Sequence, residues 1–298
     1  MHTVLLAGGT GLIGSRLSDM LRAKGYTVRI LTRSPQNEEQ FAWDPASGTI
    51  DIAALRGADT VINLAGAGIA DKRWTPERKR LIVDSRVKSA RTLRNAFLQT
   101  GIRPQLYLSA SAIGYYGNSG ERLMSESDAP VESGFLVDSC RQWEAAAGEI
   151  AALGIRTAIL RIGVVLAKEG GALAEFIKPL LFGIGGYFAD GQAWYSWVHR
   201  DDVCRMFVYA IENQNFTGVY NAVAPHPVRN KELVKAIAKA MHQPVLMVPG
   251  PALALRLALG EMAAVILNSN RISAEKALEA EFEFQYPKLE EALEAIFR

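Results

Sequence analysis

The stretch "LLAGGTGLIGSRLSDML" (residues 5–21) decides the fold. It places Gly8, Gly11 and Gly14 between a short apolar run and an amphipathic segment. Without a Cβ, these positions permit a tight turn, close approach to a pyrophosphate and close contact between helix and strand. The start of the helix adds free N–H groups and a positive dipole. This context predicts a dinucleotide site, with a purely structural turn as the alternative.

The rest of the chain alternates between short apolar runs and longer amphipathic segments. Continuous apolar strands suit a sheet covered on both faces, and strand–helix alternation predicts a parallel α/β sheet. We expect strands at 3–8, 27–33, 59–66, 105–111, 157–167 and 218–224, and helices at 12–24, 76–99 and 139–153. The helix at 76–99 has clear signals, since Thr75 can cap it, Pro76 and Glu77 open it and Gly101 can stop it. Residues 226–298 are mostly helical in pattern.

Composition excludes several classes of protein. The 298 residues carry a net charge of +2, and no basic, aromatic-studded surface indicates a nucleic-acid partner. The two cysteines, Cys140 and Cys204, disfavour a disulfide framework and favour a reducing compartment, so we expect a cytoplasmic protein. The four histidines lack zinc-site spacing, and no metal site is expected.

One apolar run is long enough to be compared with a membrane span. Residues 252–267 come nearest to a membrane span, but Arg256 and Glu261 interrupt them. We expect a buried or half-buried helix there, and no membrane association.

The end of the second expected strand indicates the cofactor. NAD sites usually carry an acidic residue about 20 positions past the glycines, whereas this chain has Thr32 and Arg33. An arginine fork can hold a 2′-phosphate, which a carboxylate would repel. The pattern favours NADP(H) over NAD(H), unless Arg33 is an ordinary surface arginine.

Further contacts are expected from "NLAG" (63–66), whose small residues could lie against the cofactor, or could form only a tight turn. Arg86, on the following helix, either reaches toward the cleft or lies on a solvated face. The predicted cofactor-binding residues are Gly8, Thr10, Gly11, Leu12, Ile13, Gly14, Thr32, Arg33, Leu64, Ala65, Gly66 and Arg86.

Together the motifs resemble a known family. "GGTGLIG", "NLAG", "SASAIGYYG", "LRIGVVL" and "WVHRDDV" occur in the order typical of extended short-chain dehydrogenase/reductases, the NAD(P)-dependent epimerase/dehydratase group. "WDPASGTID", "CRQWEAAA" and "GGYFADGQAWYSWVHRDD" are similar to its YfcH-type epimerase-family members. The resemblance covers essentially the whole chain.

The resemblance implies a Rossmann-type doubly wound parallel sheet with a smaller, mainly helical C-terminal region. Residues 1–168 would form the NADP-binding domain, with the sheet completed by 198–225. Residues 169–197 and 226–298 would lie on the substrate side.

The resemblance also implies a catalytic set that this chain only partly has. Ser111 falls at the family's substrate-binding serine. The family's Tyr-x-x-x-Lys pair, in which lysine eases proton loss from tyrosine, is replaced by Leu136 and Cys140. Three possibilities remain: Tyr115 or Tyr116 supplies the phenol, another donor such as His199 acts, or the site binds cofactor without turnover.

The predicted catalytic residues are therefore Ser111, Tyr115 and Tyr116. The leading hypothesis is an NADP(H)-dependent oxidoreductase or epimerase-like enzyme on a small carbonyl or hydroxyl substrate, including a nucleotide-sugar-like one. The alternative is a non-catalytic NADP(H)-binding redox sensor or interaction protein. The aromatic residues of 187–197 either stack on a flat substrate or seal the core. Nothing in the sequence indicates the oligomeric state.

Overall fold

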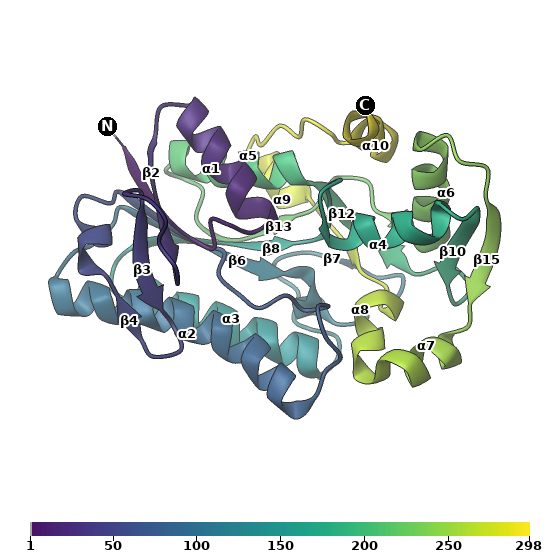
Figure 1. Ribbon diagram of the computed structural model, residues 1–298, viewed down its shortest axis with the longest axis horizontal. Helices are drawn as coiled ribbons and strands as arrows, with labels where there is room; N and C mark the ends of the chain where they lie inside the picture. Colours follow the sequence, from purple (N-terminus) through teal and green to yellow (C-terminus); the bar gives the residue numbers. More distant parts are fainter. Residues whose placement is uncertain (1) are drawn as a thin grey trace.

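An eight-stranded sheet organises the molecule, in which the computed structural model describes residues 2–298 (Figure 1). Its order is β13 (Gly218–Ala222), β8 (Arg156–Ile162), β6 (Leu106–Ala112), β5 (Thr60–Asn63), β1 (Thr3–Ala7), β2 (Thr27–Thr32), β3 (Gln40–Asp44) and β4 (Thr49–Ile50). Every pair is parallel except β3 with β4. The chain leaves β1 toward β2 and β3, then returns on the other side through β5 and β6. This reversal confirms the predicted Rossmann-type doubly wound sheet and puts its switch point beside β1.

Helices cover both faces of the sheet. In Figure 1, α1 (Leu12–Ala23) and α5 (Arg200–Glu212) lie above the sheet, and α2 (Pro76–Thr100) and α3 (Phe135–Ala151) lie below it. Along β1, Val4 and Leu6 belong to the core cluster that includes α1 and α5, whereas Leu5 belongs to the cluster that includes α2 and α3. Successive side chains of a strand point to opposite faces, so an unbroken apolar run fills both layers.

The residues expected to begin and end α2 do so in the structure. Thr75 caps the helix by accepting the Arg78 N–H at 3.2 Å, and Pro76 occupies its first turn. Gly101 closes it in the left-handed conformation, at φ 71°. The expected helix at 76–99 is therefore confirmed, with α2 ending at Thr100.

The expected strand at 157–167 is wrong as a single element. It divides at Gly163 into β8, which stays in the main sheet, and β9 (Val164–Leu166), which pairs with β12 (Trp197–His199). A Cβ at Gly163 would lie 2.4 Å from the Ser196 carbonyl oxygen, so only glycine lets the two segments pass this closely.

The C-terminal region is mainly helical and adds short strands. The remaining elements are η1 (Ile52–Leu55), η2 (Ile113–Tyr116), β7 (Leu123–Met124), α4 (Gly171–Leu180), β10 (Ile184–Phe188), β11 (Trp194–Tyr195), β14 (Val228–Arg229), α6 (Asn230–Ala240), β15 (Leu246–Gly250), α7 (Ala252–Leu259), η3 (Gly260–Ala263), α8 (Ala264–Leu267), β16 (Arg271–Ile272), α9 (Glu275–Glu279) and α10 (Leu289–Phe297). Tyr195 and Trp197 are buried in a core cluster with α4, α6 and α10. These aromatic side chains therefore seal the core.

The run at 252–267 differs from the expected buried or half-buried helix. It breaks at Gly260 (φ 60°) into α7, η3 and α8. No residue of α7 is buried, and Leu253 and Leu257 are 71% and 73% exposed. Within residues 2–298, no helix is long and apolar enough to cross a membrane.

Candidate nucleotide site and adjoining pocket

The glycine-rich turn joins β1 to α1 in the way that a dinucleotide site requires. Gly8 has φ 82°, and a Cβ there would lie 2.8 Å from the carbonyl carbon of Leu64. A Cβ at Gly14 would lie 2.2 Å from the Gly8 carbonyl oxygen. Gly11 is the N-cap of α1 and has no side chain to accept the first-turn N–H groups. The turn is thus tight, and it leaves bare amides for a pyrophosphate.

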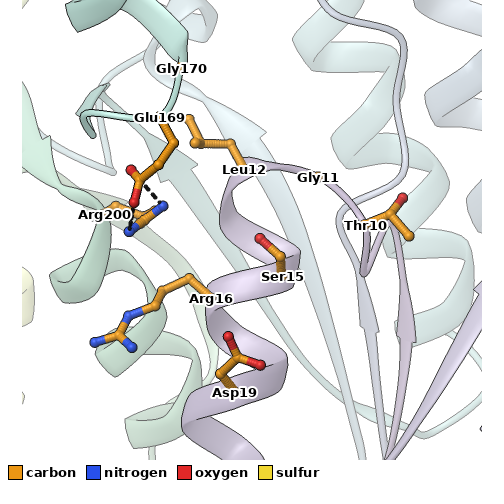
Figure 2. Close-up of a pocket in the computed structure, with 9 residues that line it drawn as sticks. All are labelled: Thr10, Gly11, Leu12, Ser15, Arg16, Asp19, Glu169, Gly170 and Arg200. Carbon is orange, nitrogen blue, oxygen red and sulfur yellow. Dashed lines mark hydrogen bonds and ion pairs between the residues drawn. The ribbon is translucent and has the colours of Figure 1, made fainter.

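A pocket of about 570 Å³ opens at this helix start. We call it the phosphate pocket; its lining is Thr10, Gly11, Leu12, Ser15, Arg16, Asp19, Glu169, Gly170 and Arg200. Figure 2 shows α1 on one side and the segment with Glu169 and Gly170 on the other. The pocket therefore has hydroxyl, amide and guanidinium donors around the place predicted for phosphate.

Both arginines of the phosphate pocket already have carboxylate partners. Arg16 donates from Nε and Nη2 to the two Asp201 carboxylate oxygens, at 2.8 and 2.7 Å. Arg200 pairs with Glu169 at 2.9 and 3.0 Å. Although burial opposes ionisation of Asp201, hydrogen bonds and charge from Arg16 hold its pKa below the usual range.

The ends of β2 and β5 flank the same turn. Thr32 is the last residue of β2, and Arg33 after it is exposed, with Ser34 rather than an acidic residue beside it. Residues 64–66 follow β5, and the Leu64 N–H donates to the Ala7 carbonyl at 2.9 Å. The structure thus brings the predicted residues of three loops to one edge of the sheet.

Arg86 extends from α2 toward this edge. Its Nη1 donates to the carbonyls of Ala67 and Ile82 at 3.0 and 2.9 Å, and its guanidinium carbon lies 4.8 Å from the Trp143 ring centroid. Burial lowers its pKa. Of the two alternatives for Arg86, the structure favours the one directed toward the cleft.

A second cavity, which we call the apolar pocket, has a volume of about 200 Å³. Its lining is Ile69, Arg86, Ala112, Ile113, Gly114, Leu136, Ser139, Cys140, Trp143, Ile162, Gly163, Val164, Ala264, Val265 and Asn270. Leu136 and Cys140 occupy the positions at which the family resemblance implies a tyrosine and a lysine, and both line this pocket. Burial raises the pKa of the Cys140 thiol to about 12, which keeps it protonated and unreactive.

Ser111 lies next to this pocket, 2% exposed, in a buried polar network. Its hydroxyl donates to Glu144 Oε1 at 2.7 Å, and Glu144 pairs with Arg161 through both carboxylate oxygens at 2.8 Å. Because the Ser111 hydrogen goes to a carboxylate, its hydroxyl can offer only lone pairs to another group.

The two predicted tyrosines have different surroundings. Tyr116 is fully buried, its hydroxyl donates to Asn221 Oδ1 at 2.7 Å, and Arg161 donates to it at 2.9 Å. Burial raises its pKa to about 12. These contacts place Tyr116 in the core and argue against it as a proton donor. Tyr115 is half-buried, with the Arg161 guanidinium carbon 3.4 Å from its ring centroid, and neither tyrosine lines the apolar pocket.

His199 has a structural position. It caps α5 by accepting the Asp201 N–H at Nδ1, at 3.1 Å, and burial lowers its pKa to about 4. The structure therefore favours a hydrogen-bonded structural histidine over a proton donor. Among residues 2–298, no group of three or more His, Cys, Asp or Glu side chains could hold a metal ion.

Several lining residues were missed in the sequence. Arg16 and Arg200 border the phosphate pocket, and Trp143 borders the apolar pocket. Trp143 could have been found, because it lies three residues after Cys140 on one helix and residues at that spacing share a face. Arg200 had no such signal, since its place depends on α5 packing against α1.

Comparisons with known proteins find two family models and several full-length relatives. The model of the NAD dependent epimerase/dehydratase family matches residues 4–222, and a domain of unknown function, DUF1731, matches residues 251–296. An epimerase family protein SDR39U1 homolog, chloroplastic, from Arabidopsis thaliana is 38% identical over 307 residues, covering 99% of this chain and 87% of its own length.

Two solved structures are similar over nearly the whole chain. The human epimerase family protein SDR39U1, solved with NADPH, has a TM-score of 0.89 and 27% identity, and 99% of each chain is covered. A nucleoside-diphosphate sugar epimerase from Corynebacterium glutamicum has a TM-score of 0.80 and 29% identity, covering 98% of this chain and 57% of the other.

Proposed function

Since the chain belongs to the NAD dependent epimerase/dehydratase family, as its motifs predicted, we propose that it binds NADP(H) and transfers hydride with a small carbonyl or hydroxyl compound. The main support is the end of β2, where Thr32 and Arg33 stand in place of an acidic residue. The human relative solved with NADPH adds support.

The proposed binding roles follow from the positions of the residues. The amides at the start of α1 hold the pyrophosphate, and the absence of a Cβ at Gly8 and Gly14 keeps that turn closed. Arg33 holds the 2′-phosphate, and residues 64–66 with Arg86 border the cofactor on the far side. When bound, NADP(H) supplies or accepts the hydride.

Fewer residues are available for catalysis than in the family pattern. Ser111 offers lone pairs that can orient a substrate hydroxyl, because its hydrogen is donated to Glu144. Tyr115 stays a predicted phenol donor. A reducing compartment such as the cytoplasm stays our prediction for the chain, supported by two free, buried cysteines.

A second candidate is a non-catalytic NADP(H)-binding protein. The observation in its favour is the apolar pair Leu136 and Cys140, which cannot perform the acid–base work of tyrosine and lysine. Tight NADPH binding without turnover of any hydride acceptor would support this candidate over the enzyme.

Calorimetric titration of the purified chain with NADPH and with NADH tests the binding proposal. We expect NADPH to bind more tightly. Arg33→Ala should weaken NADPH binding by about 10-fold or more, because a charge-assisted hydrogen bond contributes about 1.5–3 kcal/mol. NADH binding should not change.

Arg91→Ala is the matched control, because Arg91 pairs with Glu149 away from the site and its loss should leave both affinities unchanged. A folded protein that binds neither nucleotide would refute the proposal.

A further inference from the structure

We propose that the apolar pocket accepts a quinone-type substrate, a flat conjugated dicarbonyl that takes up hydride without a proton from the pocket lining. This inference rests on the proposed NADP(H) function and specifies its substrate class. It starts from what the pocket lining can and cannot do with a proton.

The polar groups of the lining do not release protons near neutral pH. The Ser139 hydroxyl donates to the Leu136 carbonyl at 2.9 Å, and the Asn270 amide donates to the Gly117 carbonyl. Cys140 is a buried thiol that stays protonated. The family's tyrosine position is filled by Leu136, so no acid–base pair faces the pocket.

The lining does contain donors that keep their hydrogens. Trp143 is 7% exposed, and within residues 2–298 its indole N–H has no hydrogen-bond partner. The Arg86 guanidinium stacks on its ring and has carbonyl partners but no carboxylate among the described ion pairs. Such donors stabilise a developing oxyanion without protonating it.

A lining that stabilises an anion but supplies no proton favours a quinone over a simple ketone as the hydride acceptor. Hydride addition to a simple ketone gives an alkoxide, about as basic as hydroxide, so an acid must supply a proton in the same step. Hydride addition to a quinone gives a hydroquinone monoanion, a phenolate with a conjugate-acid pKa of about 10. The phenolate can leave and take its proton from water.

The step balances in atoms and electrons. The C4–H bond of the nicotinamide breaks, and the hydrogen moves to the quinone together with both electrons of that bond. NADPH is thereby oxidised to NADP⁺, and the quinone is reduced to its monoanion. One proton from water then completes the hydroquinone. Trp143 and Arg86 hold the anionic oxygen until it leaves.

The size of the pocket agrees with a small flat ligand. Ligand pockets usually span about 300–1,000 Å³, whereas this one has a volume of about 200 Å³. This volume suits a single substituted ring better than a nucleotide sugar, and the Trp143 indole in the lining is available for contact with such a ring.

Tetramethyl-p-benzoquinone is a suitable probe, because its ring carbons are fully substituted and cysteine thiols cannot add to them. We expect it to oxidise NADPH in the presence of the protein, with cyclohexanone and benzaldehyde inert. The rate should be flat between about pH 6 and 9 and show no solvent isotope effect, since no group of the pocket lining transfers a proton. Reactions without protein correct for direct reduction.

Trp143→Phe tests the indole N–H. It should lower kcat by about 10-fold or more while NADPH affinity is unchanged. Trp43→Phe, another buried indole but on β3, should leave turnover unchanged. Independently of activity, labelled-tryptophan NMR should show that the quinone shifts the Trp143 indole N–H signal among the five tryptophans.

The outcomes separate the two proposals. If NADPH does not bind, the proposed function fails, and this inference fails with it. If NADPH binds but the quinone is not reduced, or if simple ketones are reduced with a bell-shaped pH profile, only the quinone inference is overturned. An unshifted Trp143 signal, or full activity of Trp143→Phe, also overturns it.

Discussion

At the residue scale, Gly14 shows how little room the glycine-rich turn between β1 and α1 leaves for a side chain. A methyl group there would lie 2.2 Å from the Gly8 carbonyl oxygen, which belongs to the backbone and cannot swing aside. We expect Gly14→Ala to destabilise the protein by about 1–3 kcal/mol or more, as overpacked sites do, and to abolish NADPH binding. Urea unfolding and calorimetric titration measure the two effects.

Gly148→Ala provides the control for Gly14→Ala. Gly148 is an exposed position of α3, and a Cβ there would meet nothing within 4 Å. Alanine should stabilise the helix by about 0.5–1 kcal/mol. Equal effects of the two substitutions would contradict the close approach at Gly14.

A second residue-scale prediction concerns the buried ion pair to which the Ser111 hydroxyl is hydrogen-bonded. Arg161 is 3% exposed, and Glu144 supplies its paired carboxylate. Glu144→Ala should cost about 3–5 kcal/mol in unfolding free energy, because it leaves a buried charge without compensation. Chemical denaturation checks this value.

Glu175→Ala removes an exposed partner of Lys178 and should change stability by no more than about 0.5 kcal/mol. If both substitutions have the same small effect, Arg161 is not held by Glu144 in the way described.

At the element scale, the start of α5 links helix capping to pH. His199 accepts the Asp201 N–H only when Nδ1 is unprotonated, and burial lowers its pKa from 6.5 to about 4. The unfolded chain therefore binds this proton first as pH falls, and stability is lost from about pH 6.5 down to about pH 4. Between pH 7 and 5 this one group should remove about 2 kcal/mol.

His199→Asn keeps a capping acceptor but does not titrate in this range. Urea unfolding at pH 7, 6 and 5 should show a shallower loss of stability for this variant than for the wild-type chain. Parallel pH profiles would exclude His199 as the source.

Some element boundaries could be predicted from the sequence, and others could not. The ends of α1 and α2 could be predicted because glycine, proline and threonine act locally. The break at Gly163 could not, because it depends on the Ser196 carbonyl that approaches from a segment more than thirty residues away. β3 was also missed, since "QFAWD" buries only Trp43 and is held by pairing with β2.

The sites divide in the same way. The residues of the glycine-rich turn are contiguous in the sequence, whereas the residues that line the apolar pocket come from several elements, among them α2, α3, the end of β8 and α8. Ser111 was found as a motif position. That Glu144 accepts its hydrogen was not, because the two side chains lie on separate elements.

At the scale of the whole molecule, one buried carboxylate ties the C-terminal region to the Rossmann sheet. Asp202 on α5 is fully buried, and its two oxygens accept the backbone N–H groups of Gln285 and Tyr286 at 2.7 and 2.9 Å. This connection fixes the segment between α9 and α10, which lie above the sheet in Figure 1.

Asp202→Ala should therefore loosen the C-terminal region as a unit. Two part-buried backbone N–H groups would lose a charged acceptor, at about 1–3 kcal/mol each, so we expect a loss of about 2–6 kcal/mol. Hydrogen exchange at Gln285 and Tyr286 should accelerate, and Asp202→Asn, which keeps one acceptor oxygen, should lose less. Asp190→Ala in an exposed turn is the control and should leave these amides protected. If the Asp202→Ala amides exchange at the wild-type rate, other contacts hold this segment, such as the hydrogen bond from Tyr209 to the Ala280 carbonyl, and the carboxylate is not its tie to the sheet.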